Sequence, residues 1–412
     1  MSEEKPWLKG LRENWYVSHF NLMSGNLPKF PDRIYVHDTT LRDGEQQPGI
    51  IFSSEDKIRI AKALDEVGVD FIEPGLPVVS QDDQEATKEI ANMGLKAKIV
   101  PFSRCIKGDI ELAYKLGCDG ITAELPTSPH LIEYGYGWSV DRAINSAVES
   151  TKYAKELGLY VTFFCIDATR SSIEFLVKML SATQEYADAF CIADSFGVST
   201  PEGYAYLIKT IKERIDKPLQ VHTHNMFGLG AANAIAGISA GAEVAHVTVN
   251  GLGEGAGNAP LEDFLVSLRM LYDKELPQIQ FNKIYPLAKL VEELSGVNIA
   301  PQKAIIGENP PATLESGIPI AWINKLEPIG RILEAIPYLP EFVGHPGLQV
   351  VLGKGSGYWS IVIKMRELGL EIPEESVVRD VMNEVKETGI AQHRALNDDD
   401  FKAILKKKGL LS

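Results

Sequence analysis

The strongest constraint on the fold is a regular alternation of short apolar runs with amphipathic stretches, between about residues 33 and 275. Eight runs rich in β-branched and apolar residues recur in this range: IYVHDTT, DFIEPG, AKIVPF, GITAEL, YVTFFCI, DAFCIAD, LQVHTH and VAHVTV. The stretches between them have helical patterns; SSEDKIRIAKALDEVG, for example, opens with serine and acidic residues and closes with glycine. Eight alternating units favour parallel strands joined by right-handed crossovers and closed into a barrel. The predicted fold is therefore an α/β (β/α)8 TIM barrel.

The chain on either side of this barrel, which we predict for residues 33–275, has a different character. Residues 1–32 are predicted to form an N-terminal arm that packs against another part of the protein. Residues 276–412 are predicted to form a smaller, mainly helical accessory region, with helical patterns at 283–296 and 374–389. Part of the sequence between these two patterns is irregular and rich in proline and glycine.

Composition and charge exclude several classes of partner. The 412 residues carry a formal net charge of −15, whereas a nucleic acid or an anionic membrane would favour a basic face. No apolar run approaches the roughly 20 residues of a membrane span, and the N-terminal sequence lacks the apolar core of a signal peptide. The four cysteines form no CxxC pair, which is typical of reduced structural thiols. We expect a cytoplasmic protein with no nucleic-acid or membrane partner.

Polar side chains gather at the ends of the predicted strands, where the active sites of such barrels lie. Seven of the eight strand ends carry charged or imidazole groups, and this agreement at one rim predicts an active site. The residues concerned are Asp38, Arg42, Asp43, Glu45, Gln46, Glu73, Arg104, Glu124, Asp194, His222, His224, Glu254 and Asn258. Among them, Gln46, Arg104 and Glu124 are candidates for binding a substrate.

The sharpest local pattern is His222-Thr223-His224, at the end of the seventh predicted strand. Residues two apart on a strand point to the same face, so both imidazoles point the same way. Asp43 could add a carboxylate oxygen, which gives two nitrogen ligands and one oxygen ligand with open positions. Such a mixed set suits a divalent metal ion and does not choose among Mn, Zn, Mg and Fe.

A metal ion beside an arginine suits chemistry on a 2-oxo acid. Forming an enolate, or attacking the keto group, builds negative charge on a carbonyl oxygen, which a divalent cation stabilises as a Lewis acid. Arg42 directly precedes Asp43, so its guanidinium can serve the same oxygen. A structural salt bridge of Arg42 with Glu73 or Glu124 is an alternative role, and the two roles are compatible.

Five ordered motifs resemble those of the DRE-TIM metallolyase superfamily (HMGL-like), which holds 2-isopropylmalate, homocitrate and citramalate synthases, 3-hydroxy-3-methylglutaryl-CoA lyase and 4-hydroxy-2-oxoacid aldolases. The motifs are HDTTLRDGEQQPG, FIEPGLP, ADSFGVSTP, VHTHNMFGLGAANA and NGLGEGAGNAPLED, and they span about residues 34–275. The last is closer to the GIGERAGNA loop of the synthases than to the cysteine-bearing loop of the lyase. Two C-terminal stretches, LVEELSGVNIAPQKAIIGEN and PYLPEFVGHPGLQVVLGKGSG, are similar to the accessory subdomain of the synthases.

The resemblance implies roles for individual residues of the metal site. Asp43, His222 and His224 match the metal ligands of the superfamily. Asn258 matches a further ligand or a close neighbour of the ion. Arg42 matches the arginine that steadies the enolate or alkoxide, so the resemblance and the local sequence pattern point to the same cluster.

The resemblance also implies roles outside the ligand set. Glu73 matches a carboxylate that faces the arginine, and Thr200 matches the threonine that holds the substrate carboxylate. Tyr338 matches a tyrosine that reaches a neighbouring active site. Because the synthases cross their accessory segment to a neighbouring subunit, we expect a homodimer in which residues after about 275 lie partly over the partner's barrel.

Three positions depart from the synthase pattern. The SGIH motif, whose histidine is thought to serve as catalytic base, reads SGIP at 316–319 here. The synthases carry an acid near the end of the fifth strand, where this chain is aligned with Thr162, and the arginine of GER is Gly255. His130, in the turn after the fourth strand, is a candidate replacement acid or base, or else a surface or supporting histidine.

The expected function follows from the resemblance and from these departures. The accessory region favours a Claisen-type condensation of an acyl-CoA with a 2-oxo acid, as in the synthases. The missing histidine and acid favour an alternative, a metal-dependent aldolase or lyase that cleaves a hydroxy acid or hydroxyacyl-CoA. A second alternative is a regulatory homologue without catalytic activity.

Overall fold

The structure is a computed structural model that describes residues 6–23, 25, 27–310 and 312–411. The chain divides into two compact units. One unit is Asn21–Ile299; the other combines the segment that ends at Phe20 with Ala300–Ser412. Within the described part of the chain, no helix has both the length and the apolar content of a membrane span.

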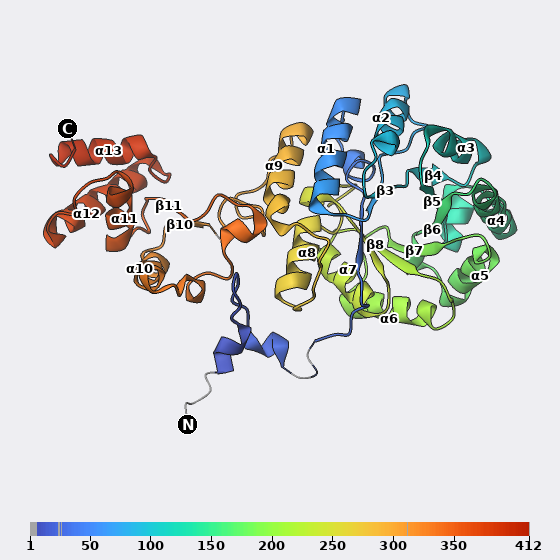
Figure 1. Ribbon diagram of the computed structural model, residues 1–412, viewed down its shortest axis with the longest axis horizontal. Helices are drawn as coiled ribbons and strands as arrows, with labels where there is room; N and C mark the ends of the chain where they lie inside the picture. The colour runs from blue at the N-terminus through green and yellow to red at the C-terminus, as the bar shows by residue number, and fades with distance from the viewer. Residues whose placement is uncertain (1–5, 24, 26, 311, 412) are drawn as a thin grey trace. The chain divides into compact units, whose positions relative to one another are not determined.

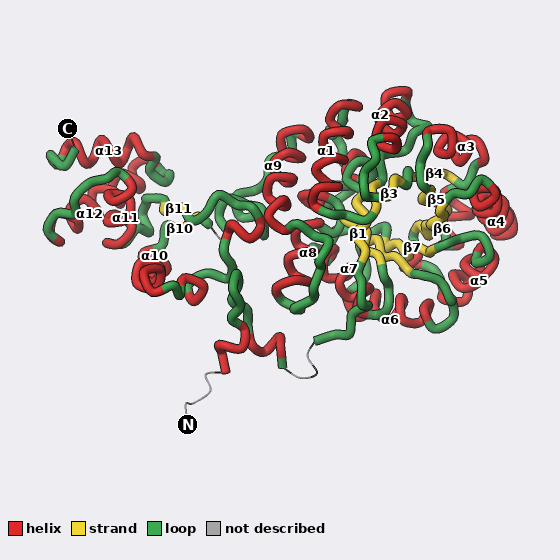
Figure 2. Tube along the Cα trace, viewed as in Figure 1, coloured by secondary structure: helices red, strands yellow, loops and turns green. Residues whose placement is uncertain are grey.

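The first unit is a (β/α)8 barrel, which confirms the fold predicted from the sequence (Figure 1). Its strand segments form one parallel sheet in the order β3-β2-β1-β9-β8-β7-β6-β5-β4. The bounds are β1 Tyr35–Asp38, β2 Phe71–Ile72, β3 Lys98–Ile99, β4 Phe102–Arg104, β5 Gly120–Pro126, β6 Tyr160–Ile166, β7 Ala189–Asp194, β8 Leu219–Thr223 and β9 Val244–Val247. Figure 2 shows these strands in yellow, curved around a common centre inside a layer of helices.

Nine strand segments make eight barrel strands because the third strand is interrupted at Pro101. Proline has no backbone N–H, so Pro101 donates no hydrogen bond to a neighbouring strand, and the third strand divides into β3 and β4 around it. The ladder continues on both sides of the interruption: Val100 N–H donates to the Ile72 carbonyl at 3.1 Å, and Asp119 N–H donates to the Ile99 carbonyl at 3.0 Å. The barrel therefore closes through β3 and β4.

Helices α1–α8 surround the strands, and α9 follows them in the same unit and packs against α1. The bounds are α1 Ser54–Val67, α2 Gln81–Asn92, α3 Lys107–Leu116, α4 Val140–Glu156, α5 Ile173–Thr183, α6 Pro201–Lys212, α7 Gly230–Ser239, α8 Leu261–Met270 and α9 Ile284–Ser295. Helix α1 begins after a capping box in which Ser53 and Asp56 exchange hydrogen bonds, and it ends at Gly68. The serine, acid and glycine signals in the sequence therefore predicted both ends of this helix.

The second unit contains mainly helices, as predicted for the C-terminal region. Its helices are α10 Gly317–Leu326, α11 Tyr358–Glu367, α12 Glu375–Gln392 and α13 Asp398–Lys407, and its parallel strands are β10 Thr313–Leu314 and β11 Gln349–Val350. Val378, Val381 and Val385 of α12 are buried in one cluster with Phe401 of α13. The amphipathic helix predicted at 374–389 is therefore present, and these valines face the core.

The N-terminal arm packs inside this second unit. Tyr16 N–H donates to the Pro337 carbonyl at 2.8 Å, and Trp15 and Tyr338 form an isolated antiparallel bridge. The ring of Trp15 meets the ring of Phe342 edge to face, with centroids 5.4 Å apart. Chain segments more than 300 residues apart in the sequence thus cover each other's aromatic side chains.

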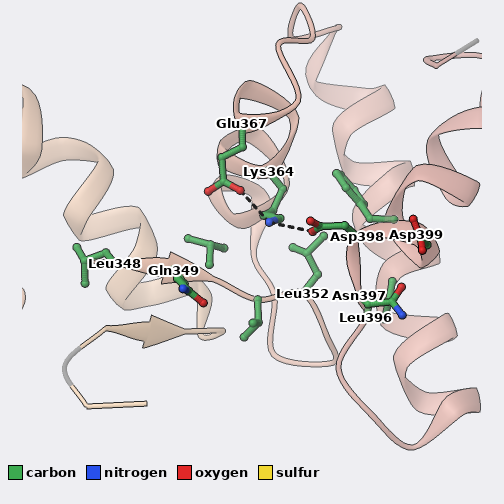
Figure 3. Close-up of a pocket in the computed structure, with 12 residues that line it drawn as sticks. Leu348, Gln349, Leu352, Lys364, Glu367, Leu396, Asn397, Asp398 and Asp399 are labelled. Atoms are coloured by element: carbon green, nitrogen blue, oxygen red, sulfur yellow. Dashed lines mark ion pairs between the residues drawn. The ribbon is translucent and has the colours of Figure 1, made fainter. Parts of the chain in front are cut away.

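A polar pocket of the second unit is lined by residues of β11, α11 and the start of α13 (Figure 3). Lys364 lies in it between two carboxylates, with Nζ 2.8 Å from Glu367 and 3.2 Å from Asp398. Burial opposes the charge of Lys364, but these two anions raise its pKa. Because its charge is already compensated by two carboxylates, Lys364 does not make this pocket an anion site.

Candidate active site

Two histidines and a carboxylate converge at the C-terminal end of the barrel strands. The Nε2 atoms of His222 and His224 are 3.3 Å apart, and Asp43 Oδ2 lies 3.1 Å from the first and 3.8 Å from the second. An ion with ligand bonds of about 2.0–2.2 Å keeps its ligands roughly 3–3.5 Å apart. The three atoms are therefore spaced like ligands of one divalent ion, on the residues that the sequence pattern had singled out.

Buried polar atoms beside this triangle also suit an ion. Asp43 Oδ1 and Asn258 Oδ1 have no hydrogen-bond partner among the described residues. Asn258 is bridged to His224 through the backbone, and its side-chain nitrogen donates to the Leu252 carbonyl at 3.2 Å. This leaves its carbonyl oxygen for another partner. Because buried oxygens without a partner are rare, these two atoms favour a bound cation.

The surroundings of the triangle set protonation states that suit metal binding. Burial opposes the charge of Asp43, but the Arg42 guanidinium and a hydrogen bond from His222 hold the pKa of this carboxyl well below its ordinary value. Burial lowers the pKa of His222 to about 4, against the opposing effect of Asp43. A charged carboxylate and a neutral imidazole at pH 7 are the forms that bind metal.

Arg42 is held in place by three acceptors. Its Nε donates to Glu73 Oε2 at 2.7 Å, and its NH1 nitrogen donates to Asp43 Oδ2 at 3.0 Å and to Gln46 Oε1 at 3.3 Å. Burial would raise the pKa of Glu73, but the charge of Arg42 outweighs it and, with a neighbouring histidine, lowers this pKa to about 2. The salt bridge considered for Arg42 is thus made with Glu73. Its NH2 nitrogen has no partner among the described residues and can donate to a substrate oxygen.

A second group of potential ligands, His37, Glu73 and His246, is buried inside the barrel. The two imidazoles are stacked, with ring centroids 4.0 Å apart and planes inclined by 30°. The nitrogen lone pairs of an imidazole lie in its ring plane, and two rings stacked face to face are poorly arranged to share one ion. His246 Nε2 is also 2.7 Å from Gln220 Oε1. This group is therefore a layer of polar packing and not a second metal centre.

Arg104 and Glu124 are register partners near the ends of β4 and β5. Arg104 is held by Asp109, with Nε 2.7 Å from Oδ2 and a second nitrogen 3.1 Å from Oδ1. Burial raises the pKa of Glu124 to about 7 against the charges of Arg42 and Arg104. Its Oε2 has no hydrogen-bond partner among the described residues. Of these two predicted substrate-binding residues, Arg104 is occupied by a helix carboxylate, whereas Glu124 has a free oxygen.

His130 belongs to a charged cluster that the sequence analysis missed. Its Nε2 is 3.1 Å from Oδ2 of Asp167, a buried residue directly after β6. Asp167 also accepts hydrogen bonds from Ser128 Oγ at 2.6 Å and from Arg170 Nε at 2.7 Å. Because Arg170 already neutralises Asp167, His130 shares this carboxylate with a permanent cation. The turn DATR directly after a predicted strand was the signal that could have identified Asp167.

The expectation that Thr162 stands near the end of the fifth barrel strand is wrong. That strand is β6, and Thr162 is its third residue, where the hydroxyl accepts a hydrogen bond from Gln220 Nε2 at 3.1 Å. The strand ends at Ile166, and Asp167 follows it. In a strand of mainly apolar residues, the sequence does not show which residue is the last of the strand. Matching the motifs of relatives could therefore place Thr162 too close to the strand end. The acidic residue Asp167 therefore lies directly after the last residue of the strand, Ile166.

The other two departures from the synthase pattern have a backbone basis. Gly255 has φ +67°, a conformation that favours glycine over any residue with a side chain. Pro319 lies in the first turn of α10, after the N-cap Ser316. A proline is tolerated there because the first backbone nitrogens of a helix have no helical partner. The Pro319 side chain has no titratable group, so it cannot act as the base that the histidine of SGIH is thought to provide.

Thr200 and Tyr338 lie in different surroundings. Thr200 is the N-cap of α6, and its Oγ1 accepts a hydrogen bond from Gly203 N–H at 3.2 Å. The hydroxyl proton remains able to donate to a carboxylate. Tyr338 is buried in the second compact unit, where it is bridged to Trp15. Its role in a neighbouring active site stays a prediction.

The fold and the site together define a class of protein: (β/α)8 barrels with a His-His-Asp cluster and a fixed arginine at the strand ends. More particularly, the chain belongs to the HMGL-like family, whose model matches residues 33–291. The resemblance to the DRE-TIM metallolyases inferred from the motifs is thereby confirmed.

Relatives with assigned names cover most of the chain. Homocitrate synthase AksA of Methanothermobacter thermautotrophicus is 37% identical over 95% of this chain and 97% of its own length. The 2-isopropylmalate synthase of Methanocaldococcus jannaschii is 40% identical over 89% of this chain and 69% of its own. Among solved structures, the HMG-CoA lyase of Bacillus subtilis superposes with a TM-score of 0.60 at 18% identity, over 67% of this chain and 98% of that one. The last comparison concerns the fold alone.

Proposed function

We propose that this protein is a metal-dependent acyltransferase that condenses an acyl-CoA, such as acetyl-CoA, with a 2-oxo acid in a Claisen-type reaction. The observation that carries the proposal is the triangle of Asp43, His222 and His224 beside Arg42. It is supported by relatives named homocitrate, 2-isopropylmalate and (R)-citramalate synthases, which align over 89–95% of the chain. We choose an acyl-CoA as the co-substrate because the synthases with these names condense acetyl-CoA with a 2-oxo acid.

The metal site has defined residues in this proposal. Asp43, His222 and His224 hold a divalent ion, and Asn258 contributes its free oxygen or lies next to the ion. Mn, Zn, Mg and Fe are all compatible with two nitrogens and carboxylate oxygen. When bound, the ion supplies Lewis-acid stabilisation of a carbonyl oxygen.

The chain's own groups bind and orient the 2-oxo acid. Arg42 directs its unpaired NH2 nitrogen at the keto oxygen and stabilises the negative charge that develops there. Glu73 and Gln46 hold the guanidinium in place, so little reorganisation is needed during the reaction. Thr200 donates its hydroxyl proton to the substrate carboxylate.

A cleavage reaction is the second candidate, and one observation favours it. Pro319 stands where the synthases carry the histidine thought to act as base, so the deprotonation apparatus of this chain differs from theirs. A metal-dependent lyase or aldolase would use the same metal and the same arginine in the reverse direction. The relatives over most of the chain are synthases, and for this reason we favour condensation.

A parallel screen tests the proposal. The full-length protein, loaded in turn with Mn²⁺, Zn²⁺ and Mg²⁺, is incubated with acetyl-CoA and 2-oxo acids of different side chains, and free thiol is followed. A second set of reactions follows cleavage of 2-hydroxy and 4-hydroxy-2-oxo acids. Thiol release that depends on the 2-oxo acid supports condensation, and cleavage without condensation supports the lyase. Silence in both sets, with metal bound, would favour a regulatory homologue.

A further inference from the structure

We infer that Glu124 is the general base of this enzyme, taking the place of the histidine that the chain lacks in its SGIP segment. This inference rests on the proposed condensation. It is drawn from the position of Glu124 in the barrel, from the pairing of the two arginines near it, and from its unpartnered oxygen.

The register of the sheet places Glu124 on the active-site side of the barrel wall. Glu124 is paired with Phe164 of the next strand, and register partners of a parallel sheet project to the same face. The Phe164 ring lies 5.0 Å from the ring of the metal-site His222 and 5.7 Å from the Arg42 guanidinium. Glu124 therefore projects into the barrel mouth, two residues before the end of β5.

The cations that face Glu124 are already compensated by other carboxylates. Arg42 pairs with Glu73 at 2.7 Å, and Arg104 pairs with Asp109 at 2.7 Å. Neither arginine is therefore fully available to hold Glu124 in its charged form. Asp109 adds negative charge nearby and opposes ionisation further.

The uncharged groups around Glu124 have a similar consequence. On the site side, the rings of Phe102 and Phe164 meet edge to face at 5.3 Å and add apolar surface to this part of the wall. Tyr136, in the loop between β5 and α4, makes a hydrogen bond with Glu124 but brings no charge, because burial raises the pKa of Tyr136 to about 12. Burial raises the pKa of Glu124 to about 7, so both its forms are populated near neutral pH. A group that exchanges protons in catalysis needs this property.

The other candidate base, His130, is less suited. Its carboxylate partner Asp167 also accepts two hydrogen bonds from Arg170, and the His130 side chain is 47% exposed to solvent. A half-exposed imidazole at the rim lacks the water exclusion that protects a reactive carbanion equivalent. Glu124 is the more enclosed of the two groups.

The proposed step balances in atoms and charge. The Glu124 carboxylate takes a proton from the carbon next to the thioester carbonyl, and the C–H electron pair forms the new bond to the keto carbon of the 2-oxo acid. The π electrons of the keto group move to its oxygen, which faces Arg42. That oxygen receives the proton from the Glu124 carboxyl, which regenerates the carboxylate. Water then hydrolyses the thioester and releases the CoA thiol.

The test compares Glu124→Gln with Glu124→Asp and with Glu149→Gln, an exposed control on α4. In the wild type, kcat should rise with pH through an inflection near 7, because the base must be deprotonated. Glu124→Gln should lower kcat by about 10²–10⁴-fold and abolish this inflection. Glu124→Asp should keep the inflection at a reduced rate, and Glu149→Gln should behave like the wild type.

Two further measurements separate a catalytic role from a structural one. Calorimetric titration with Mn²⁺ and with the 2-oxo acid should give unchanged affinities for Glu124→Gln. Wild-type enzyme should exchange deuterium from D₂O into the acetyl methyl group of acetyl-CoA when an unreactive 2-oxo acid analogue is bound, and Glu124→Gln should not. An active Glu124→Gln that keeps the inflection overturns the assignment, as does an inflection that disappears only in His130→Gln. A wild type that releases no thiol with any 2-oxo acid instead refutes the proposed function.

Discussion

Replacing Gly253 by alanine should disrupt the metal site through a neighbouring residue. Gly253 has φ +151°, and a Cβ added to it would lie 2.1 Å from Asn258 Nδ2 and 3.3 Å from Asp43 Oδ1. The first distance is far below any real contact, so Asn258 must move. Because Asn258 carries the unpartnered oxygen next to the triangle, its displacement should change metal affinity even though no ligand of the triangle is mutated.

The expected magnitude follows from comparable supporting residues of metal sites. Losing such a residue weakens metal binding by about 10–100-fold, which corresponds to about 1.4–2.7 kcal/mol. The backbone of Gly253→Ala also carries a strain of about 1–3 kcal/mol that should appear as lower thermal stability. The two effects are separable, because metal affinity and unfolding are measured in different experiments.

The assay is Mn²⁺ titration by calorimetry and thermal unfolding in the presence of chelator, for wild type and two variants. Gly94→Ala is the matched control, because Gly94 also has a positive φ, +70°, but an added Cβ meets nothing within 4 Å. It should lose only about 1–2 kcal/mol of stability and should bind Mn²⁺ normally. If Gly253→Ala binds Mn²⁺ as tightly as Gly94→Ala, Asn258 has no part in the site and this reasoning fails.

Three more outcomes are expected. His222→Ala and His224→Ala should each lose the bound metal after dialysis, as measured by elemental analysis; unchanged metal content would argue against the triangle. Tyr338→Phe should lower kcat and leave metal content unchanged, because its hydroxyl is proposed to act on the substrate of a neighbouring subunit. Light scattering of the full-length protein should accordingly show a homodimer, and a monomer would contradict it.

Much of the barrel could be predicted from the sequence because its signals are local. The capping box of Ser53 and Asp56 lies within four residues, and each apolar run marks its own strand. His222 and His224 share a face simply because they are two residues apart on a strand. Asp43 is distant in the sequence, but the end of β1 brings it to the same rim, as parallel strands require.

Features that depend on contacts between distant segments could not be predicted in this way. No local pattern pairs Trp15 with Tyr338, because the arm and its partner are separated by the whole barrel. The rhythm of strands and helices stops near residue 275, yet α9 still packs against α1. The bond between His130 and Asp167 joins two turns after neighbouring strands, and the sequence shows only the turns.

The status of Glu124 shows why charge in a sequence says little about chemistry. The sequence marked Glu124 as a charged strand end and a candidate for substrate binding, but it lies outside the five motifs and nothing local indicated a proton-transfer role. What distinguishes it is that Arg42 is paired with Glu73 and Arg104 with Asp109, so the charges of these arginines only partly offset the effect of burial on Glu124. Enclosed beside Phe164, the carboxyl then has its pKa raised to about 7 by burial. A proton-transfer group can thus arise wherever a barrel mouth pairs its cations elsewhere, and the loss of the usual histidine need not end the reaction.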